Sequence, residues 1–503
     1  MINVTYINTF RDLFAGSRNL ARSLDSANKS RNVEFKDFFM RRPWVTEKLA
    51  FPMSPVIIEL LRILIHCLSA PIVKISNKKP LEFSLTVPVL LTTIVVGIGS
   101  GLSGMLLVYL LHYVQHLSFG YSLDLIISRE HFLSGVTAAS PLRRVIVLST
   151  CGVIAGLGWW AIYRLTNPPI SITEAIKTDP SRMPRLTTLL HALLQIITVA
   201  MGSPLGREVA PREVSAIFAS WCSSKIGLSL NEAKILTACG AGAGLAAVYN
   251  VPLGGAVFTL EVLLCHFNGS AVLLAFLSSI IAVLVARLGL GNFSEYHIHP
   301  LTSNASLVMW AIITSPVFGI MAYWFSRGAT YMSRQVKHNW QVPVFCLFNF
   351  FIIGILAIYF PALLGNGRSP TQMEFSNAIG FELSATLLLL RVLITWSSLR
   401  AGAHGGILTP SLANGALLAV VLGEIWLLFS TGTDLSAFAI VGAAAFLAAA
   451  QKMPLTAIIL IFEFTKVSFS FLLPVTCAVI GAVTICRLCL HFEKKYSGNW
   501  LFF

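Results

Sequence analysis

The sequence predicts an all-α integral membrane protein built from two repeated halves, and three observations support this. Of the 503 residues, 55% are hydrophobic and only 12% are charged, which is more apolar surface than a soluble domain of this size can bury. Apolar segments long enough to cross a bilayer as helices follow one another along the chain. Many are interrupted by Gly and Pro, and one interrupted segment recurs in the second half.

The recurring segment supports the division into two halves. The run Gly240–Leu253 returns as Gly442–Leu455, and Glu261 and Glu463 each follow the Pro of their run by nine residues. A helix start broken by Gly and Pro that occurs once in each half is typical of a two-repeat transporter or channel. Chance similarity between Ala/Gly-rich helices is the alternative.

Residues 1–82 are expected to form a basic cytoplasmic N-terminal region. Within it, Pro55–Ile75 is apolar but carries Glu59, Arg62 and His66. These polar residues favour a helix at the membrane interface over a true span.

Residues 83–290 are expected to form the first membrane repeat, and residues 291–503 the second repeat with a short cytoplasmic C-terminus. The first is predicted to hold helices at Phe83–Leu117, Val145–Leu165, Leu186–Met201, Arg212–Trp221, Ala233–Tyr249, Pro252–Phe267 and Val272–Leu290. The second is predicted to hold helices at Leu307–Tyr323, Val342–Leu364, Ala385–Thr395, Ile407–Leu428, Ala437–Ala450, Pro454–Phe464 and Phe469–Leu490. Several are shorter than the roughly 20 residues of a span, so we expect tilted and broken helices around a site near the membrane midplane.

Charge and cysteine content exclude other classes. The formal charge of +14 comes mainly from the N-terminal region and short loops, which fits an anionic membrane surface and cytoplasmic termini rather than nucleic acid. Cys486 and Cys489 form a CxxC without a second Cys or His pair, so no metal and no cofactor is expected. The chain lacks HExxH, Walker and Gly-x-Ser-x-Gly motifs, so an enzyme is not expected. We expect a multi-pass protein of the plasma (inner) membrane.

The segment Gly202–Pro211 is the strongest candidate site. It places Arg207 and Glu208 at membrane depth, where charged residues are costly and usually functional. A Gly-rich turn that opens a helix directs free N–H groups and the positive end of the helix dipole at one spot, which suits an anion. We therefore predict an ion-handling site in which the Glu208 carboxylate competes for the place of the anion. Gly405–Pro410 repeats the same pattern in the second half.

These residues resemble the CLC chloride channel and transporter family, over roughly residues 84–497. Gly206-Arg207-Glu208 is similar to its GREGP signature, whose Glu is the gate, and Gly406–Pro410 is similar to its GxFxP motif, whose backbone amides help to hold the anion. The run from Gly240 to Glu261 is also close to a family stretch. Tyr496 falls where the family places a Tyr whose hydroxyl contacts the central anion. The resemblance implies two inverted helical repeats, a homodimer with one anion pathway per subunit, and here no C-terminal CBS domains.

Four departures from the family pattern affect this interpretation. The signature continues as Val209-Ala210-Pro211, so its Pro is displaced and a flexible Gly is lost. Leu408 replaces the Phe of the second motif. The family's anion-binding Ser corresponds to Asn167, or with a one-residue gap to Pro168, and only Asn167 has a side-chain donor. Val262 stands where proton-coupled members commonly carry an inner Glu.

We therefore predict CLC-type transport of chloride or a similar small anion across a lipid bilayer. Glu208 is the predicted gate, and the predicted anion-binding residues are Asn167 or Pro168, Gly206, Arg207, Gly406, Ile407, Leu408 and Tyr496. Three helix starts, including the one near Asn167, are expected to converge on the anion. Val262 favours passive, channel-like conduction, and the alternative is a proton-coupled chloride antiporter.

Other polar residues receive structural interpretations. Glu261 and Glu463 are expected to pair with helix ends or to line the subunit interface. Glu213 is expected to lie off the anion pathway. His404 is expected to be an accommodated loop histidine, with pH sensing as the alternative. The sequence leaves the choice among chloride, nitrate and fluoride open.

Overall fold

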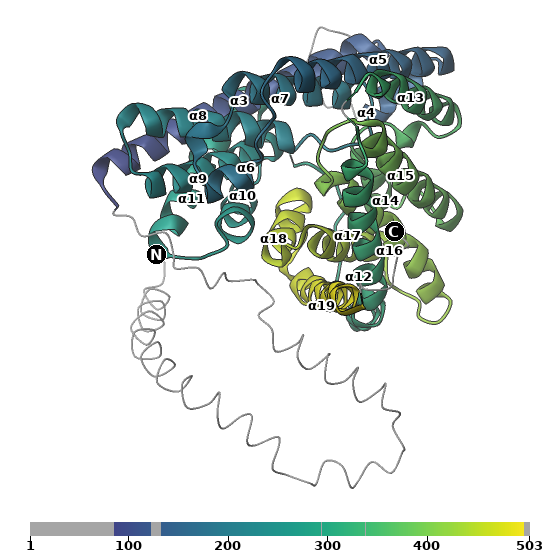
Figure 1. Cartoon of the computed structure of the whole chain (residues 1–503). Helices are drawn as coiled ribbons and strands as arrows, with labels where there is room; N and C mark the ends of the chain where they lie inside the picture. Colours follow the sequence, from purple (N-terminus) through teal and green to yellow (C-terminus); the bar gives the residue numbers. More distant parts are fainter. Residues whose placement is uncertain (1–84, 122–131, 293, 338, 497–503) are drawn as a thin grey trace, which may run out of the picture. The chain divides into compact units, whose positions relative to one another are not determined.

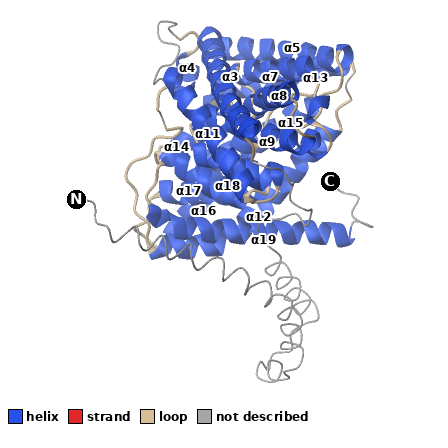
Figure 2. Cartoon of the chain, turned by 90° about the vertical axis from the view of Figure 1, so that its left-hand side faces the viewer, coloured by secondary structure: helices blue, strands red, loops and turns tan. Residues whose placement is uncertain are grey.

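The structure is a computed structural model that describes residues 85–121, 132–292, 294–337 and 339–496, with the backbone alone for residues 494–496. Its described part consists of helices joined by loops (Figure 2). The predicted interfacial helix at Pro55–Ile75 lies outside the described residues. The expected all-α membrane fold is confirmed.

The first half runs from α3 to α11. Its elements are α3 (Val87–Phe119), α4 (Phe132–Ala138), α5 (Pro141–Leu165), α6 (Ile172–Lys177), η2 (Pro180–Arg182), α7 (Arg185–Ala200), α8 (Val209–Ile226), α9 (Leu230–Tyr249), α10 (Pro252–Phe258), the π-helical η3 (Thr259–Leu264) and α11 (Gly269–Leu290). The second half has α12 (Ala305–Arg334), α13 (Gln341–Tyr359), η4 (Pro361–Leu363), α14 (Arg368–Phe375), α15 (Phe381–Ala401), α16 (Leu408–Leu427), α17 (Leu435–Gln451), α18 (Pro454–Thr465), η5 (Phe469–Phe471) and α19 (Leu472–Tyr496).

The predicted helices are present, but several boundaries differ. Helix α8 begins at Val209 rather than at Arg212, because Pro211 sits in the first turn, where a backbone N–H has no helical partner to lose. Helix α15 is about twice as long as the predicted Ala385–Thr395, since it continues from Phe381 to Ala401, and the charged Arg391 near its middle is completely buried. Carbonyl groups of Leu363 and Gly365 accept hydrogen bonds from this guanidinium at 3.3 and 3.5 Å.

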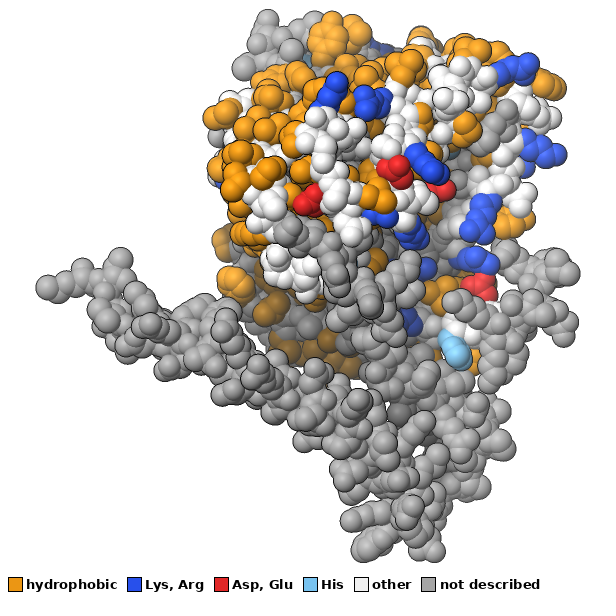
Figure 3. Space-filling model, turned by 60° about the vertical axis from the view of Figure 1, so that its left-hand side comes forward, with side chains coloured by type: hydrophobic (Ala, Val, Ile, Leu, Met, Phe, Trp, Pro, Cys, Tyr) orange, Lys and Arg blue, Asp and Glu red, His pale blue; other side chains and the backbone are white. Residues whose placement is uncertain are grey.

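Eight helices in the described part are long and apolar enough to cross a membrane: α3, α5, α11, α12, α13, α15, α16 and the η5–α19 segment. Large apolar side chains on several of them are exposed, such as Leu106, Leu288 and Phe348 at 64%, 87% and 62%. Figure 3 shows one such face, with a broad area of apolar side chains and with Lys and Arg gathered largely to one side of it. Lipid is the solvent that suits such a surface.

The two halves cross the membrane in opposite directions. One face, which we call the basic face because Lys and Arg concentrate in its loops, carries the connections 166–184, 227–229 and 335–340. The other, which we call the opposite face, carries 291–304, 360–380 and 428–434. Helix α8 runs from the middle of the protein to the basic face, whereas its counterpart α16 runs from the middle to the opposite face. The repeats are therefore inverted, and α5 packs on α13 and α10 on α18 across them (Figure 1).

The segment that recurs 202 residues later in the sequence, Gly240–Leu253 and Gly442–Leu455, has the same backbone geometry in both places. Helices α9 and α17 both end at a residue in the left-handed region, Asn250 and Lys452, each with φ of 58°. Pro252 and Pro454 then open α10 and α18 at the first helical turn, where Pro is favoured. The same local sequence thus builds the same reversal of the chain twice.

Candidate functional site

The two short loops that precede α8 and α16 meet near the middle of the protein. Gly206 and Gly406 pair as an antiparallel bridge, with N–H to O distances of 2.7 and 2.9 Å. The loop before α8 comes from the opposite face, and the loop before α16 comes from the basic face. The pairing therefore joins the inverted halves at their centre. Both glycines belong to the predicted anion-binding set, and the structure brings them together.

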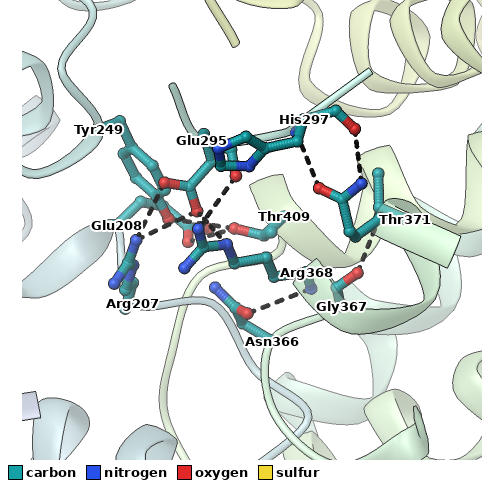
Figure 4. Close-up of polar contacts among 11 residues, drawn as sticks. Arg207, Glu208, Tyr249, Glu295, His297, Asn366, Gly367, Arg368, Thr371 and Thr409 are labelled. Atoms are coloured by element: carbon teal, nitrogen blue, oxygen red, sulfur yellow. Dashed lines mark hydrogen bonds and ion pairs between the residues drawn. The ribbon is translucent and has the colours of Figure 1, made fainter. Parts of the chain in front are cut away.

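The Glu208 carboxylate lies directly beside this pairing and is fully buried. The backbone N–H of Leu408 donates to its Oε1 at 2.7 Å. The Thr409 hydroxyl donates to its Oε2 at 3.3 Å (Figure 4). The Tyr249 hydroxyl lies 3.1 Å from Thr409 Oγ1. We call this arrangement the Glu208 seat.

The start of α16 explains why a carboxylate occupies this place. Ile407 is the N-cap and Leu408 the first helical residue, so the Leu408 N–H is one of the donors that a helix leaves free at its N-terminus. The helix dipole adds positive potential at the same point. Because Leu408 contributes its backbone N–H, the identity of its side chain does not affect the donor.

The two glycines of the pairing are required for space. A Cβ at Gly406 would lie 1.8 Å from Glu208 Oε1, and one at Gly206 would lie 2.0 Å from Oε2. Non-bonded atoms do not approach each other this closely, so the Glu208 seat can form only where both residues lack a side chain.

Arg207 does not pair with Glu208. Its guanidinium forms an ion pair with Glu295 at 3.2 Å and lies 5.0 Å from the centre of the Tyr249 ring. Arg368 contacts the same carboxylate, with Nε 3.2 Å from Glu295 Oε1. Two cations therefore share one carboxylate, which leaves this group with one net positive charge (Figure 4).

A cavity lies next to this group. Its lining includes Arg207, Arg368, Asn366, His112, Gln115 and His116. Asn366 and Arg368 belong to the 360–380 connection, so the cavity belongs to the opposite face. A positively charged concavity of this kind raises the local concentration of anions.

Two of the remaining predicted site residues, Asn167 and Pro168, lie elsewhere, and the prediction for Tyr496 stays a prediction. Asn167 and Pro168 follow α5 and are exposed, and no contact with the Glu208 seat is observed among the described residues. Asn167 is not the N-cap of the helix that follows; Ser171 caps α6 by accepting from Glu174 N–H at 3.2 Å. Tyr496 ends α19, and its side chain lies outside the described residues.

Glu261 and Glu463 pair with helix ends, as predicted. Glu261 accepts from the N–H groups of Leu455 and Thr456 at 3.0 and 2.7 Å, at the start of α18. Glu463 accepts from Leu253 and Gly254 at 3.0 and 2.6 Å, at the start of α10. Carboxylates at helix N-termini are stabilising.

Sequence reasoning missed four residues of the site: Thr409, Tyr249, Glu295 and Arg368. Thr409 lies within a motif that was recognised, and its hydroxyl was the available signal. Tyr249 stands where the second half has Gln451, so a departure from the repeat marked it. Glu295 and Arg368 carry no local pattern that distinguishes them from other loop residues. In the described ranges, no group of three or more His, Cys, Asp or Glu side chains is placed to hold a metal.

Comparisons with known proteins identify relatives of this chain. Residues 145–487 match the family model described as "Voltage gated chloride channel". The chain is 28% identical over 347 residues to a voltage-gated ClC-type chloride channel, ClcB, of Citrobacter koseri, covering 66% of this chain and 82% of the relative. It is 28% identical over 384 residues to ClcB of Escherichia coli, covering 73% and 89%.

Solved structures show the same fold. A slow cyanobacterial Cl⁻/H⁺ antiporter matches with a TM-score of 0.70 at 21% identity, covering 83% of this chain and 100% of that chain. A eukaryotic CLC transporter matches with a TM-score of 0.61 at 17% identity, covering 80% and 72%. The chain belongs to the CLC family of voltage-gated chloride channels and related anion transporters.

Proposed function

We propose that this protein moves chloride or a similar small anion across a membrane, with the Glu208 carboxylate as a displaceable plug. The observation that carries the proposal is the buried Glu208 carboxylate on the Leu408 N–H at 2.7 Å. A free N–H group at a helix N-terminus can donate to any compact anion, so an inorganic anion can replace the carboxylate. Protonation of Glu208 removes the charge that holds it there and frees the seat.

The electrostatics of the opposite face support entry of anions. The single net positive charge of the Arg207–Glu295–Arg368 group attracts anions without a full cationic clamp on the path. Weak binding of this kind permits exit as well as entry.

The arrangement in the membrane follows from the same features. By the positive-inside rule, the basic face is proposed to be cytoplasmic, which places both ends of the helical unit in the cytoplasm and the cavity outside. We propose the plasma membrane as the location. The Glu208 seat joins loops of both halves of the chain, and we propose a homodimer with one such pathway in each subunit.

Passive conduction and proton-coupled exchange remain two forms of this function. Val262 lacks a titratable group and favours passive conduction. A buried acid–histidine pair between Glu208 and the basic face, Glu213 and His191, favours exchange. We infer that the protein is an exchanger on this observation.

The test is anion efflux from proteoliposomes with external pH recorded in the same vessel. Wild-type chloride efflux is expected to depend on pH, and Glu208→Gln is expected to give constitutive flux with no pH dependence. Glu174→Gln neutralises an exposed carboxyl and serves as the control. An unchanged pH dependence in Glu208→Gln would show that Glu208 is not the gate.

A further inference from the structure

A second cluster of titratable side chains lies between Glu208 and the basic face. His191 of α7 places Nδ1 2.9 Å from Oε2 of Glu213 on α8. The Gln195 amide Nε2 lies 2.8 Å from the same imidazole nitrogen and 3.1 Å from the same carboxylate oxygen. The side chains of His191 and Glu213 are only 9% and 14% exposed.

The geometry gives one proton two resting places. A proton between Nδ1 and Oε2 can belong to either atom across 2.9 Å, because an imidazole nitrogen and a carboxylate oxygen are both proton acceptors. When His191 carries it, the Gln195 amide can donate to the Glu213 carboxylate. Helices α7 and α8 already pack together. The contact between His191 and Glu213 is therefore not needed merely to hold the two helices in place.

Aromatic rings surround the histidine. The Trp159 ring lies 4.8 Å from the rings of both His191 and His404, and the two imidazoles are 5.4 Å apart. Tyr163 lies 5.4 Å from His404. His404 belongs to the loop that leads to the Gly206–Gly406 pairing, so the cluster reaches from the basic side toward the centre of the protein.

Arg212 links this cluster to the gate. Its Nε donates to the backbone carbonyl of Glu208 at 2.8 Å, and its guanidinium interacts electrostatically with both the Glu208 and Glu213 carboxylates. Glu208 and Glu213 are five residues apart on one helix, about 7.5 Å along the axis. Protonation of one carboxylate therefore changes the counter-charge available to the other.

Few other charged or titratable groups act on the pair. Tyr163 interacts electrostatically with Glu213, His404 faces His191, and Arg212 faces Glu213. Of the elements packed against α7 and α8, α9 carries Glu232, Lys234 and Tyr249, η2 carries Arg182, and both elements put their charged groups at the basic face. Helix α5, which packs on α7, carries Arg164 in its last turn at the basic face and Arg143 and Arg144 in its first turn at the opposite face. The titratable residues of α3 are Tyr109, His112, Tyr113 and His116, all in its last turns toward the opposite face.

We propose that the Glu213–His191 pair takes up protons from the basic face and passes them to Glu208, so that anion transport is coupled to proton movement. Residues of α7 and α8 then carry out the inner proton-transfer step, because Val262 has no titratable side chain. The inference rests on the proposed role of Glu208 as the gate. Glu213 stays off the anion pathway, because it lies on the side of α8 that faces α7.

The experiment measures chloride and proton flux together in proteoliposomes of the full chain. For the wild type, a chloride gradient is expected to drive protons uphill. Glu213→Gln is expected to lower the ratio of proton flux to chloride flux by about 100-fold, the lower end of the contribution typical of a positioned proton-transfer group. Glu213→Asp keeps a carboxyl group and is expected to retain the ratio within about threefold. Glu174→Gln, on the exposed surface of α6, is the matched control.

The outcomes separate this inference from the proposed function. Wild-type chloride flux without proton movement would overturn the inference and leave anion transport standing, whereas absence of any anion flux would overturn both. A wild-type ratio in Glu213→Gln would exclude the pair from the proton route. Equal loss of the ratio in the Gln and Asp variants, together with a lowered melting temperature in both, would assign the pair a packing role instead.

Discussion

Glu261 caps the helix that leads to Glu463, and Glu463 caps the helix that leads to Glu261. Each carboxylate accepts two backbone N–H groups from the first turn of the partner helix in the other half. The exchange satisfies donors that helices α10 and α18 would otherwise leave free. It also fastens the two inverted halves to each other at the contact between α10 and α18.

Removal of these caps should lower stability unequally. Glu261 is nearly buried and also accepts from the Thr456 hydroxyl at 2.6 Å, whereas Glu463 lacks such a third donor among the described residues. We expect Glu261→Ala to lower the free energy of unfolding by about 2–4 kcal/mol and Glu463→Ala by about half as much. Thermal unfolding in detergent measures both. A stable Glu261→Ala that loses proton coupling would contradict the capping role and point to proton transport by Glu261.

Gly406→Ala should empty the Glu208 seat. The new methyl carbon would lie only 1.8 Å from Glu208 Oε1, so the carboxylate must leave or the loops must separate. We expect chloride flux at neutral pH to rise several-fold and its pH dependence to flatten, as for Glu208→Gln. Gly269→Ala is the matched control, because nothing lies within 4 Å of a Cβ there. Wild-type pH dependence in a folded Gly406→Ala protein would show that Glu208 has another resting place.

The Glu208 seat was partly predictable because its donors are local features. Gly and Pro mark where α8 and α16 begin, and a helix start always offers free N–H groups, so Leu408 could be named from the sequence. The carboxylate of the seat, Glu208, also lies in a segment with Gly and Pro at the start of a helix. Repetition of the motif then indicated that two such starts face each other.

Contacts between distant segments could not be predicted in this way. Glu295 joins Arg207 and Arg368 across the two halves, and no periodicity or motif marks any of these pairings. Arg391 shows a related difficulty: it is fully buried within α15, and only one of its guanidinium nitrogens donates, to the backbone carbonyls of Leu363 and Gly365, while Nε and the other terminal nitrogen have no hydrogen-bond partner among the described residues. Local composition reports the cost of a buried charge, and only the fold shows how that cost is offset.

Arg368→Gln should weaken the attraction of anions to the opposite face. The change reduces the net charge of the Arg207–Glu295–Arg368 group from one to zero. We expect chloride flux at low ionic strength to fall about threefold, with a smaller loss at high salt because ions screen the field. Lys466→Gln, an exposed change at the end of α18 on the same face, controls for total charge. An equal loss at every salt concentration would indicate a structural effect rather than an electrostatic one.

Glu374 should make stability fall as pH rises. This residue of α14, which is not one of the helices long enough to cross a membrane, is fully buried, and the Ser384 hydroxyl offsets only part of the effect of burial on its carboxyl group. Burial raises the pKa of Glu374 from 4.5 to about 9. Between these two values the unfolded chain ionises while the folded protein keeps its proton, so stability is greatest below pH 4.5 and declines toward pH 9.

Glu374→Gln keeps the size and polarity of the side chain but removes its ionisation. We therefore expect the variant to have a higher melting temperature than the wild type at pH 8, with the difference disappearing near pH 4.5, where both carry a neutral side chain. Melting temperatures in detergent across this range measure the effect, and Glu382→Gln, exposed in the first turn of α15, is the control. If the Gln variant and the wild type melt with the same pH dependence, Glu374 is ionised in the folded protein and must have a compensating partner.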